Sequence, residues 1–357
     1  MARHFRQPQP MARQANWDLL RALSMFAVVV VHTAGGAVST AAILCDPIFF
    51  ALSGYFGIRE PKHGLRRYYL SRFTTVVLPL FIYSALLYLR RDLATGISPS
   101  GYIAYLAHLM DPWWFIPALI PFLILAPFLA RMFEHLEDGH VLLIARLAAL
   151  AAAWGIVSSV LSWAIGGAGH STWEDLIQIA TRLVPASIVP GAGYFIYFCL
   201  GYFFRRLRKI LIPCQKRRLV ALGLAMWALD VAFAVIGIPR ADPSHPWLFA
   251  TFAILLIFDT IKIESGPARK AVEWVARRSY TIYLLQYTAI ALVQPFFPST
   301  ANAGGLLPSW IPIAISAWAL SLLAASVIDP TLLRLAQQGA ERLVLAVPAP
   351  KRKRDRA

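Results

Sequence analysis

One apolar stretch of the sequence carries ionisable side chains at helical spacing. The segment NWDLLRALSMFAVVVVHTAGG contains Asp18, Arg21 and His32. Asp18 and Arg21 lie one helical turn apart, so they can pair on one helix face. Arg21 and His32 are separated by about three turns plus 20°, which places both on one face about 16 Å apart along the axis. An ionisable residue inside a membrane span is costly unless it is paired or hydrated, so all three are candidate functional residues.

The two basic side chains suggest different chemical roles. Arginine binds phosphate groups through two parallel hydrogen bonds, whereas neutral histidine is the natural general base near pH 7. A helix face with Arg21 near one end and His32 deeper predicts a channel that binds an anionic ligand at its mouth and reacts farther in. Two simpler interpretations stay open. His32 could pack against a backbone carbonyl, and Arg21 could extend to the membrane interface.

The composition predicts that these residues lie in a membrane protein. The chain has 357 residues, of which 58% are hydrophobic and only 15% charged, and its mean hydropathy is +0.59. Soluble domains carry about 25% charged residues. The sequence therefore predicts an all-α, polytopic integral membrane protein with about ten transmembrane helices. The predicted spans are 17–37, 41–58, 73–89, 112–130, 141–165, 191–204, 219–238, 246–262, 279–297 and 309–330.

The basic residues predict the orientation of these spans. If the N-terminus is cytoplasmic, 28 of the 34 Lys and Arg residues fall in cytoplasmic segments, as the positive-inside rule requires. Both termini are then cytoplasmic, with a basic N-terminal segment (1–16), a transmembrane domain (17–330) and a basic tail (331–357). The cations lie in short loops between spans, which argues against a nucleic-acid partner. High Ala and Arg usage favours a bacterial source, and hence a multi-pass protein of the bacterial cytoplasmic membrane.

Several motifs in chain order resemble a known family. Arg21 and His32 follow Asn16-Trp17-Asp18-Leu19-Leu20, the second span reads DPIFFALSGYF, and further matches are WWFIPALIPFLILAPFL, GYFIYFCLGYFFRR and SYTIYLLQ. The ordered set, from about residue 16 to 330, resembles membrane-bound acyltransferase family 3, whose members are integral membrane O-acyltransferases. Two positions depart from the family pattern. Thr75 stands where the second Arg of an Arg-x-x-Arg pair is usual, and Gln286 stands where a histidine is usual.

The resemblance implies acyl transfer from cytoplasmic acyl-CoA, acetyl-CoA by family habit, to a hydroxyl group. The acceptor would be a glycan, a lipid-linked glycan or a small molecule on the extracytoplasmic side of the bilayer. Acyl-CoA is then a co-substrate, and no cofactor is bound permanently. In this interpretation His32 is the general base, with Arg21 and Asp18 beside it in the catalytic set. The CoA phosphates would bind Arg21, Arg66, Arg67 and Arg72, and the positioning residues would be Ser53, Tyr55, Trp114, Tyr280 and Gln286.

Other functions are weighed against this one. A transporter or flippase for an anionic or glycan-linked substrate would use the same buried charges as a path, but it would tend to show paired halves, and the sequence has no internal repeat. The eight His residues are scattered, so no metal site is expected. The three Cys residues predict packing rather than disulfides. Asp230 lies within a predicted span, and a pairing with Arg146 is one possibility.

Overall fold

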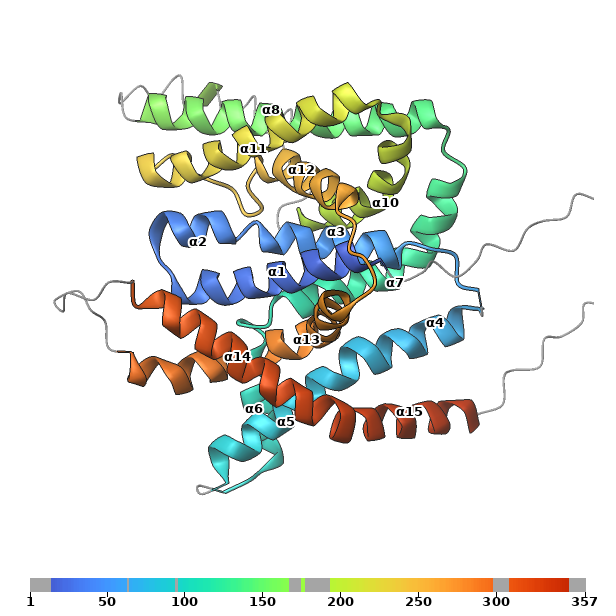
Figure 1. The fold of residues 1–357 in the computed structure, drawn as a ribbon, viewed down its shortest axis with the longest axis vertical. Helices are drawn as coiled ribbons and strands as arrows, with labels where there is room; N and C mark the ends of the chain where they lie inside the picture. The colour runs from blue at the N-terminus through green and yellow to red at the C-terminus, as the bar shows by residue number, and fades with distance from the viewer. Residues whose placement is uncertain are drawn as a thin grey trace, which may run out of the picture.

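A computed structural model describes residues 14–62, 64–93, 96–166, 175–176, 193–297 and 308–346. Every regular element in these ranges is helical. Figure 1 shows long helices running back and forth across the molecule in roughly parallel layers. The main helices are α1 (Ala15–Thr33), α2 (Gly36–Ala42), α3 (Cys45–Gly57), α4 (Gly64–Arg72), α5 (Leu78–Asp92), α6 (Pro99–Leu109), α7 (Phe115–Glu134), α8 (Asp138–Gly166), α10 (Tyr194–Ile210), α11 (Pro213–Ile236), α12 (Trp247–Thr260), α13 (Pro267–Val293), α14 (Trp310–Ile328) and α15 (Arg334–Ala346).

Three short segments of other helical types join or extend these helices. Two π-helical turns, η1 (Phe73–Val77) and η3 (Asp329–Leu333), connect α4 to α5 and α14 to α15, and a 3₁₀ turn, η2 (Gln294–Phe296), follows α13. Helix α15 contacts η1, because the Gln337 amide of α15 donates to the Thr74 carbonyl at 3.0 Å. Helices α14 and α15 are joined through η3 without a break, so the predicted domain boundary at residue 330 falls inside a continuous helical segment.

The helices are suited to a bilayer. Seven helical segments within the described residues are long and apolar enough to cross a membrane, and α12 is apolar but shorter. The prediction of an all-helical, multi-pass membrane protein is confirmed at this level, and each of the ten predicted spans overlaps a helix. Most of the segment between the fifth and sixth predicted spans, 166–190, lies outside the described residues.

Helices α3 and α10 pack at very short range because each presents a glycine to the other. A methyl group added to Gly54 would lie 1.7 Å from the Phe198 carbonyl oxygen, and one added to Gly201 would lie 1.9 Å from the Ala51 oxygen. Small residues allow such approach between membrane helices, where van der Waals contact replaces the hydrophobic effect. Both glycines belong to motifs identified in the sequence, so these motifs hold the scaffold together.

Asp230 has a different partner from the one suggested by the sequence. Its side chain is fully buried on α11 and accepts hydrogen bonds from Trp247 Nε1 at 2.8 Å, from Arg240 at 3.1 Å and from the Ser244 hydroxyl. Arg240, not Arg146, neutralises its charge. The network ties the segment after α11 to the start of α12, because a buried carboxylate needs several donors and a cation.

Candidate active site

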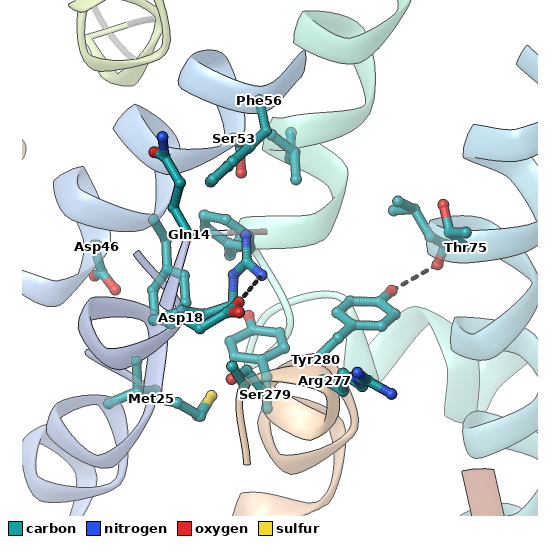
Figure 2. Close-up of a pocket in the computed structure, with 18 of the residues that line it drawn as sticks. Gln14, Asp18, Met25, Asp46, Ser53, Phe56, Thr75, Arg277, Ser279 and Tyr280 are labelled. Carbon is teal, nitrogen blue, oxygen red and sulfur yellow. Dashed lines mark hydrogen bonds and ion pairs between the residues drawn. The ribbon is translucent and has the colours of Figure 1, made fainter. Parts of the chain in front are cut away.

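A cavity of about 580 Å³ lies along one face of α1. Gln14, Arg21, Met25 and Val28 line it from α1 and the residue before it, and Asp18, which also lines it, lies 3.5 Å from Arg21. Figure 2 shows Asp18 in the cavity, with Ser53 and Asp46 from α3 and Tyr280 from α13 around it. The spacing of Arg21, Met25 and Val28 is that of one helix stripe, so α1 forms a continuous wall.

Three arginines line the cavity. Arg21 and Arg59 stack on Phe56, with guanidinium carbons 5.5 Å and 5.7 Å from the ring centre, and Arg277 lines the cavity from α13. Burial, followed by the nearby charge of Arg72, lowers the pKa of Arg59. Arginine stays protonated regardless. The part of the cavity around Phe56 is therefore suited to an anion, and phosphate groups match the guanidinium fork.

His32 lies one turn beyond the residues of α1 that line the cavity. Its ring faces Tyr287 of α13, with the tyrosine oxygen 3.0 Å from Nε2 and the ring centres 4.6 Å apart. His32 itself is exposed. Val28 precedes His32 by one turn on α1, and Tyr283 precedes Tyr287 by one turn on α13. Both Val28 and Tyr283 line the cavity. The imidazole thus lies on the Arg21 face, as the spacing predicted, with a hydroxyl partner that the spacing did not identify.

The positioning residues predicted from the sequence divide between the cavity and the core. Ser53 and Tyr280 line the cavity, and the Tyr280 hydroxyl donates to the Val76 carbonyl at 2.6 Å. Tyr55 is buried against Trp17, at 5.0 Å between ring centres, and Trp114 packs on Tyr194 at 5.2 Å. Neither Tyr55 nor Trp114 is among the residues that line the cavity.

Gln286 and Tyr287 explain one departure from the family pattern. Gln286 is fully buried, and within the described residues neither polar atom of its amide has a hydrogen-bond partner. The next residue, Tyr287, contacts His32 instead. Consecutive helical residues point about 100° apart, so a polar group at 287 reaches the imidazole while 286 faces a helix interface.

The predicted phosphate-binding arginines of α4 lie outside the cavity lining. Arg66 and Arg67 are exposed. Arg72 stacks over Tyr68 at 5.1 Å and borders a separate apolar hollow of about 400 Å³. Thr75, which stands in place of the usual second arginine, does line the main cavity. Besides the predicted Arg21, the guanidinium groups there come from Arg59 and Arg277, which sequence reasoning counted only as topology signals.

Asp46 is a further cavity residue that sequence reasoning left without a role. It lies in the first turn of α3 and lines the cavity, whereas Arg59 follows the other end of that helix. The sequence signal that could have identified Asp46 is its position as the first residue of the motif DPIFFALSGYF. In the part of the chain that the structure describes, no three His, Cys, Asp or Glu side chains gather as metal ligands.

The structure is an apolar helical bundle with a cavity that is lined by arginines, and His32 lies farther along α1, one of the helices that line this cavity. These features define an integral membrane protein with an enzyme-like site. The sequence profile of an acyltransferase domain matches residues 14–328, which is most of the chain and includes every residue of the site. The chain therefore belongs to membrane-bound acyltransferase family 3. No curated protein and no solved structure matched the chain in the corresponding comparisons.

Proposed function

We propose that this membrane acyltransferase moves an acyl group, acetyl by family habit, from cytoplasmic acyl-CoA to a hydroxyl of an extracytoplasmic acceptor. The acceptor is a glycan, a lipid-linked glycan or a small molecule. One observation carries the proposal: Arg21 and His32 lie on one face of α1, and the cavity covers that face from Gln14 to Val28. This arrangement suits a donor that enters at its anionic end and reacts near the imidazole.

The proposed reaction needs one base. Neutral His32 takes the proton of the acceptor hydroxyl as its oxygen attacks the thioester carbonyl carbon. The carbon–sulfur bond then breaks, the acyl group stays on the acceptor oxygen, and the CoA thiolate takes the proton from the imidazolium. The Tyr287 hydroxyl, 3.0 Å from Nε2, orients the ring. Ser53, which lines the cavity, is placed to polarise the thioester carbonyl.

The arginines support the choice of donor. Arg21, Arg59 and Arg277 line the cavity, and CoA diphosphate would meet these guanidinium groups while the acyl end extends toward Val28. Arg66, Arg67 and Arg72 lie on the neighbouring helix α4. There they would meet the parts of CoA that stay outside the cavity. The donor therefore approaches from the same side as the start of α4.

We propose ten spans with both termini in the cytoplasm of a bacterium. In Figure 1, α1 begins, α4 begins and α15 ends on the right of the view, whereas the turn between α1 and α2 lies on the left. The right side then carries the excess of basic residues that cytoplasmic loops require. Green fluorescent protein fused after residue 357 would fluoresce in cells, because it folds on the cytoplasmic side. A fusion protein that does not fluoresce, and whose C-terminal part is labelled by a reagent added outside the cells, would contradict this orientation.

The test of function follows label from donor to acceptor. Membranes containing the protein are incubated with acetyl-CoA labelled in the acetyl group, and hydroxylamine-sensitive ester label is counted in the glycan and lipid fractions and in the soluble fraction. His32→Gln should lower ester formation by about 100-fold or more, since a general base contributes that much. His135→Gln changes an exposed histidine after α7, and should retain activity.

Two results would contradict the proposal. Full activity in a folded His32→Gln protein would remove histidine from the base role. Movement of a glycan substrate across vesicle membranes with no consumption of acyl-CoA would favour the transporter or flippase instead.

A further inference from the structure

Basic and acidic side chains line the cavity from opposite ends of α3. Asp46 lies in the first turn of α3 and Arg59 lies two residues after its last residue, Gly57, so roughly 17 Å of helix separates them. Figure 2 shows the Asp46 carboxylate on α3, apart from Arg277 and Tyr280 on α13. In the proposed reaction the anionic donor occupies the arginine end. The carboxylate end is then left for the acceptor.

Asp46 is linked electrostatically to the tyrosine that contacts His32. Its carboxylate interacts electrostatically with the Tyr287 hydroxyl, which is the group that contacts His32. It also interacts with Tyr283 and Tyr194. A substrate hydroxyl placed at His32 would therefore bring the neighbouring part of the same molecule to Asp46.

The carboxyl group of Asp46 has no basic partner among the described residues. Its hydrogen bond comes from the Cys45 thiol at 3.5 Å, and the charged group that influences it is another carboxylate, Asp242. Asp242 accepts a hydrogen bond of 2.5 Å from Tyr194, and Asp46 also interacts electrostatically with this tyrosine.

Other inward-facing carboxylates of the protein have stronger ion-pair or hydrogen-bond partners than Asp46 has. Asp18, Asp230 and Asp259 each pair with an arginine. Asp329 accepts hydrogen bonds from the hydroxyls of Tyr83 and Thr281, both at 2.8 Å. A carboxylate in a low-dielectric site is strongly disfavoured without such partners, and intramembrane charges normally pair. Asp18 and Asp46 both line the cavity, and of these two Asp46 is the one whose donor is a weak thiol.

We propose that the acceptor carries a cationic ammonium group next to the hydroxyl that is acylated, and that Asp46 binds this group. The inference rests on the proposed function for the identity of the hydroxyl. The ammonium group stays charged throughout, because only the hydroxyl proton moves to His32. Asp46 is thus a specificity residue: it selects amino alcohols or amino sugars over neutral alcohols of the same shape.

The experiment uses two alcohols that differ only in charge. Choline and 3,3-dimethylbutan-1-ol have the same shape, and neither can be acylated at a position other than oxygen. The full-length protein in lipid nanodiscs is given acetyl-CoA and each alcohol, and the acetyl ester is measured by mass spectrometry. Binding of radiolabelled choline is measured separately by equilibrium dialysis, with the neutral alcohol as competitor, so that affinity is known without turnover.

We expect kcat/KM to be at least about tenfold higher for choline, the size of effect expected of a charge-assisted hydrogen bond. Asp46→Asn should remove this preference and the choline binding while retaining transfer to the neutral alcohol. Asp46→Ala, with the same thermal unfolding temperature, provides a second variant. Asp111→Asn changes an exposed carboxylate just before α7 and should retain the preference, which excludes a general surface-charge effect.

The outcomes separate the two proposals. Equal transfer to both alcohols, or a preference that survives in both Asp46 variants, overturns the ammonium site and leaves the acyltransferase intact. Asp46-dependent choline binding with no ester formed from either alcohol supports the ammonium site and counts against the proposed reaction. Absence of choline binding and of any charge preference overturns the ammonium site.

Discussion

The Tyr287 hydroxyl lies 3.0 Å from Nε2 of His32, and it reaches the imidazole from a helix 255 residues away in sequence. The hydrogen bond fixes the ring orientation on a histidine that is otherwise exposed. In the proposed reaction His32 must accept a proton along one direction, and a base benefits from such restraint. The role that we propose for Tyr287 is therefore to position His32.

Tyr287→Phe should lower kcat by about tenfold, because it removes one hydrogen bond of roughly 1.4 kcal/mol at the base. The KM for acetyl-CoA should stay unchanged, because the donor phosphates bind at the other end. The measurement is steady-state ester formation as a function of acetyl-CoA. Tyr69→Phe is the matched control, since that hydroxyl donates to the Ile124 carbonyl and not to His32. An effect on KM alone would place Tyr287 in donor binding instead.

The arginines at the cavity mouth should control donor affinity. Arg59→Gln and Arg277→Gln are each expected to raise the KM for acetyl-CoA by about tenfold with kcat nearly constant, because each removes a charge-assisted phosphate contact. The exposed Arg66 and Arg67 should give smaller, salt-sensitive effects when changed to Gln, because exposed charges are screened. Titration of KM against salt concentration separates the two groups. Equal effects from both would place the main phosphate contact on α4.

The buried Asp230 network should matter for stability. Asp230→Ala leaves Arg240 and the Trp247 indole without their shared acceptor, and breaking a buried pair costs about 3–5 kcal/mol. We expect a lower apparent Tm in detergent and lower yield. Combining Asp230→Ala with Arg240→Gln should cost less than the sum of the single changes. Strict additivity would show that the two side chains are not coupled.

The contact between α3 and α10 should tolerate no added methyl group. In Gly201→Ala the new carbon would lie 1.9 Å from the Ala51 oxygen and 2.5 Å from the Tyr55 nitrogen, so the helices must separate. Overpacking typically costs about 1–3 kcal/mol, which should appear as a lower apparent Tm. Gly139→Ala is the control, because nothing lies within 4 Å of its added carbon. An unchanged Tm in Gly201→Ala would show that the two helices separate without cost.

Much of the architecture could be predicted because it depends on local properties. Apolar runs long enough to cross a bilayer predict helices wherever they occur, and the structure places a helix at each of them. The Arg21–His32 face follows from helical periodicity alone, since α1 runs unbroken from Ala15 to Thr33. Helix ends were less accurate: α4 (Gly64–Arg72) extends the third predicted span, 73–89, toward its N-terminus.

The sequence by itself determined the membrane class, the family and the residues of α1 that share one face, because each depends on composition, on ordered motifs or on a period within one helix. The tertiary structure decided which distant side chains meet them. It placed Tyr287 rather than Gln286 at His32, Arg59 and Arg277 at the cavity, and Arg240 rather than Arg146 at Asp230. Such pairings depend on the rotation and depth of one helix against another, which small residues such as Gly54 and Gly201 set through contact distances that no single helix encodes.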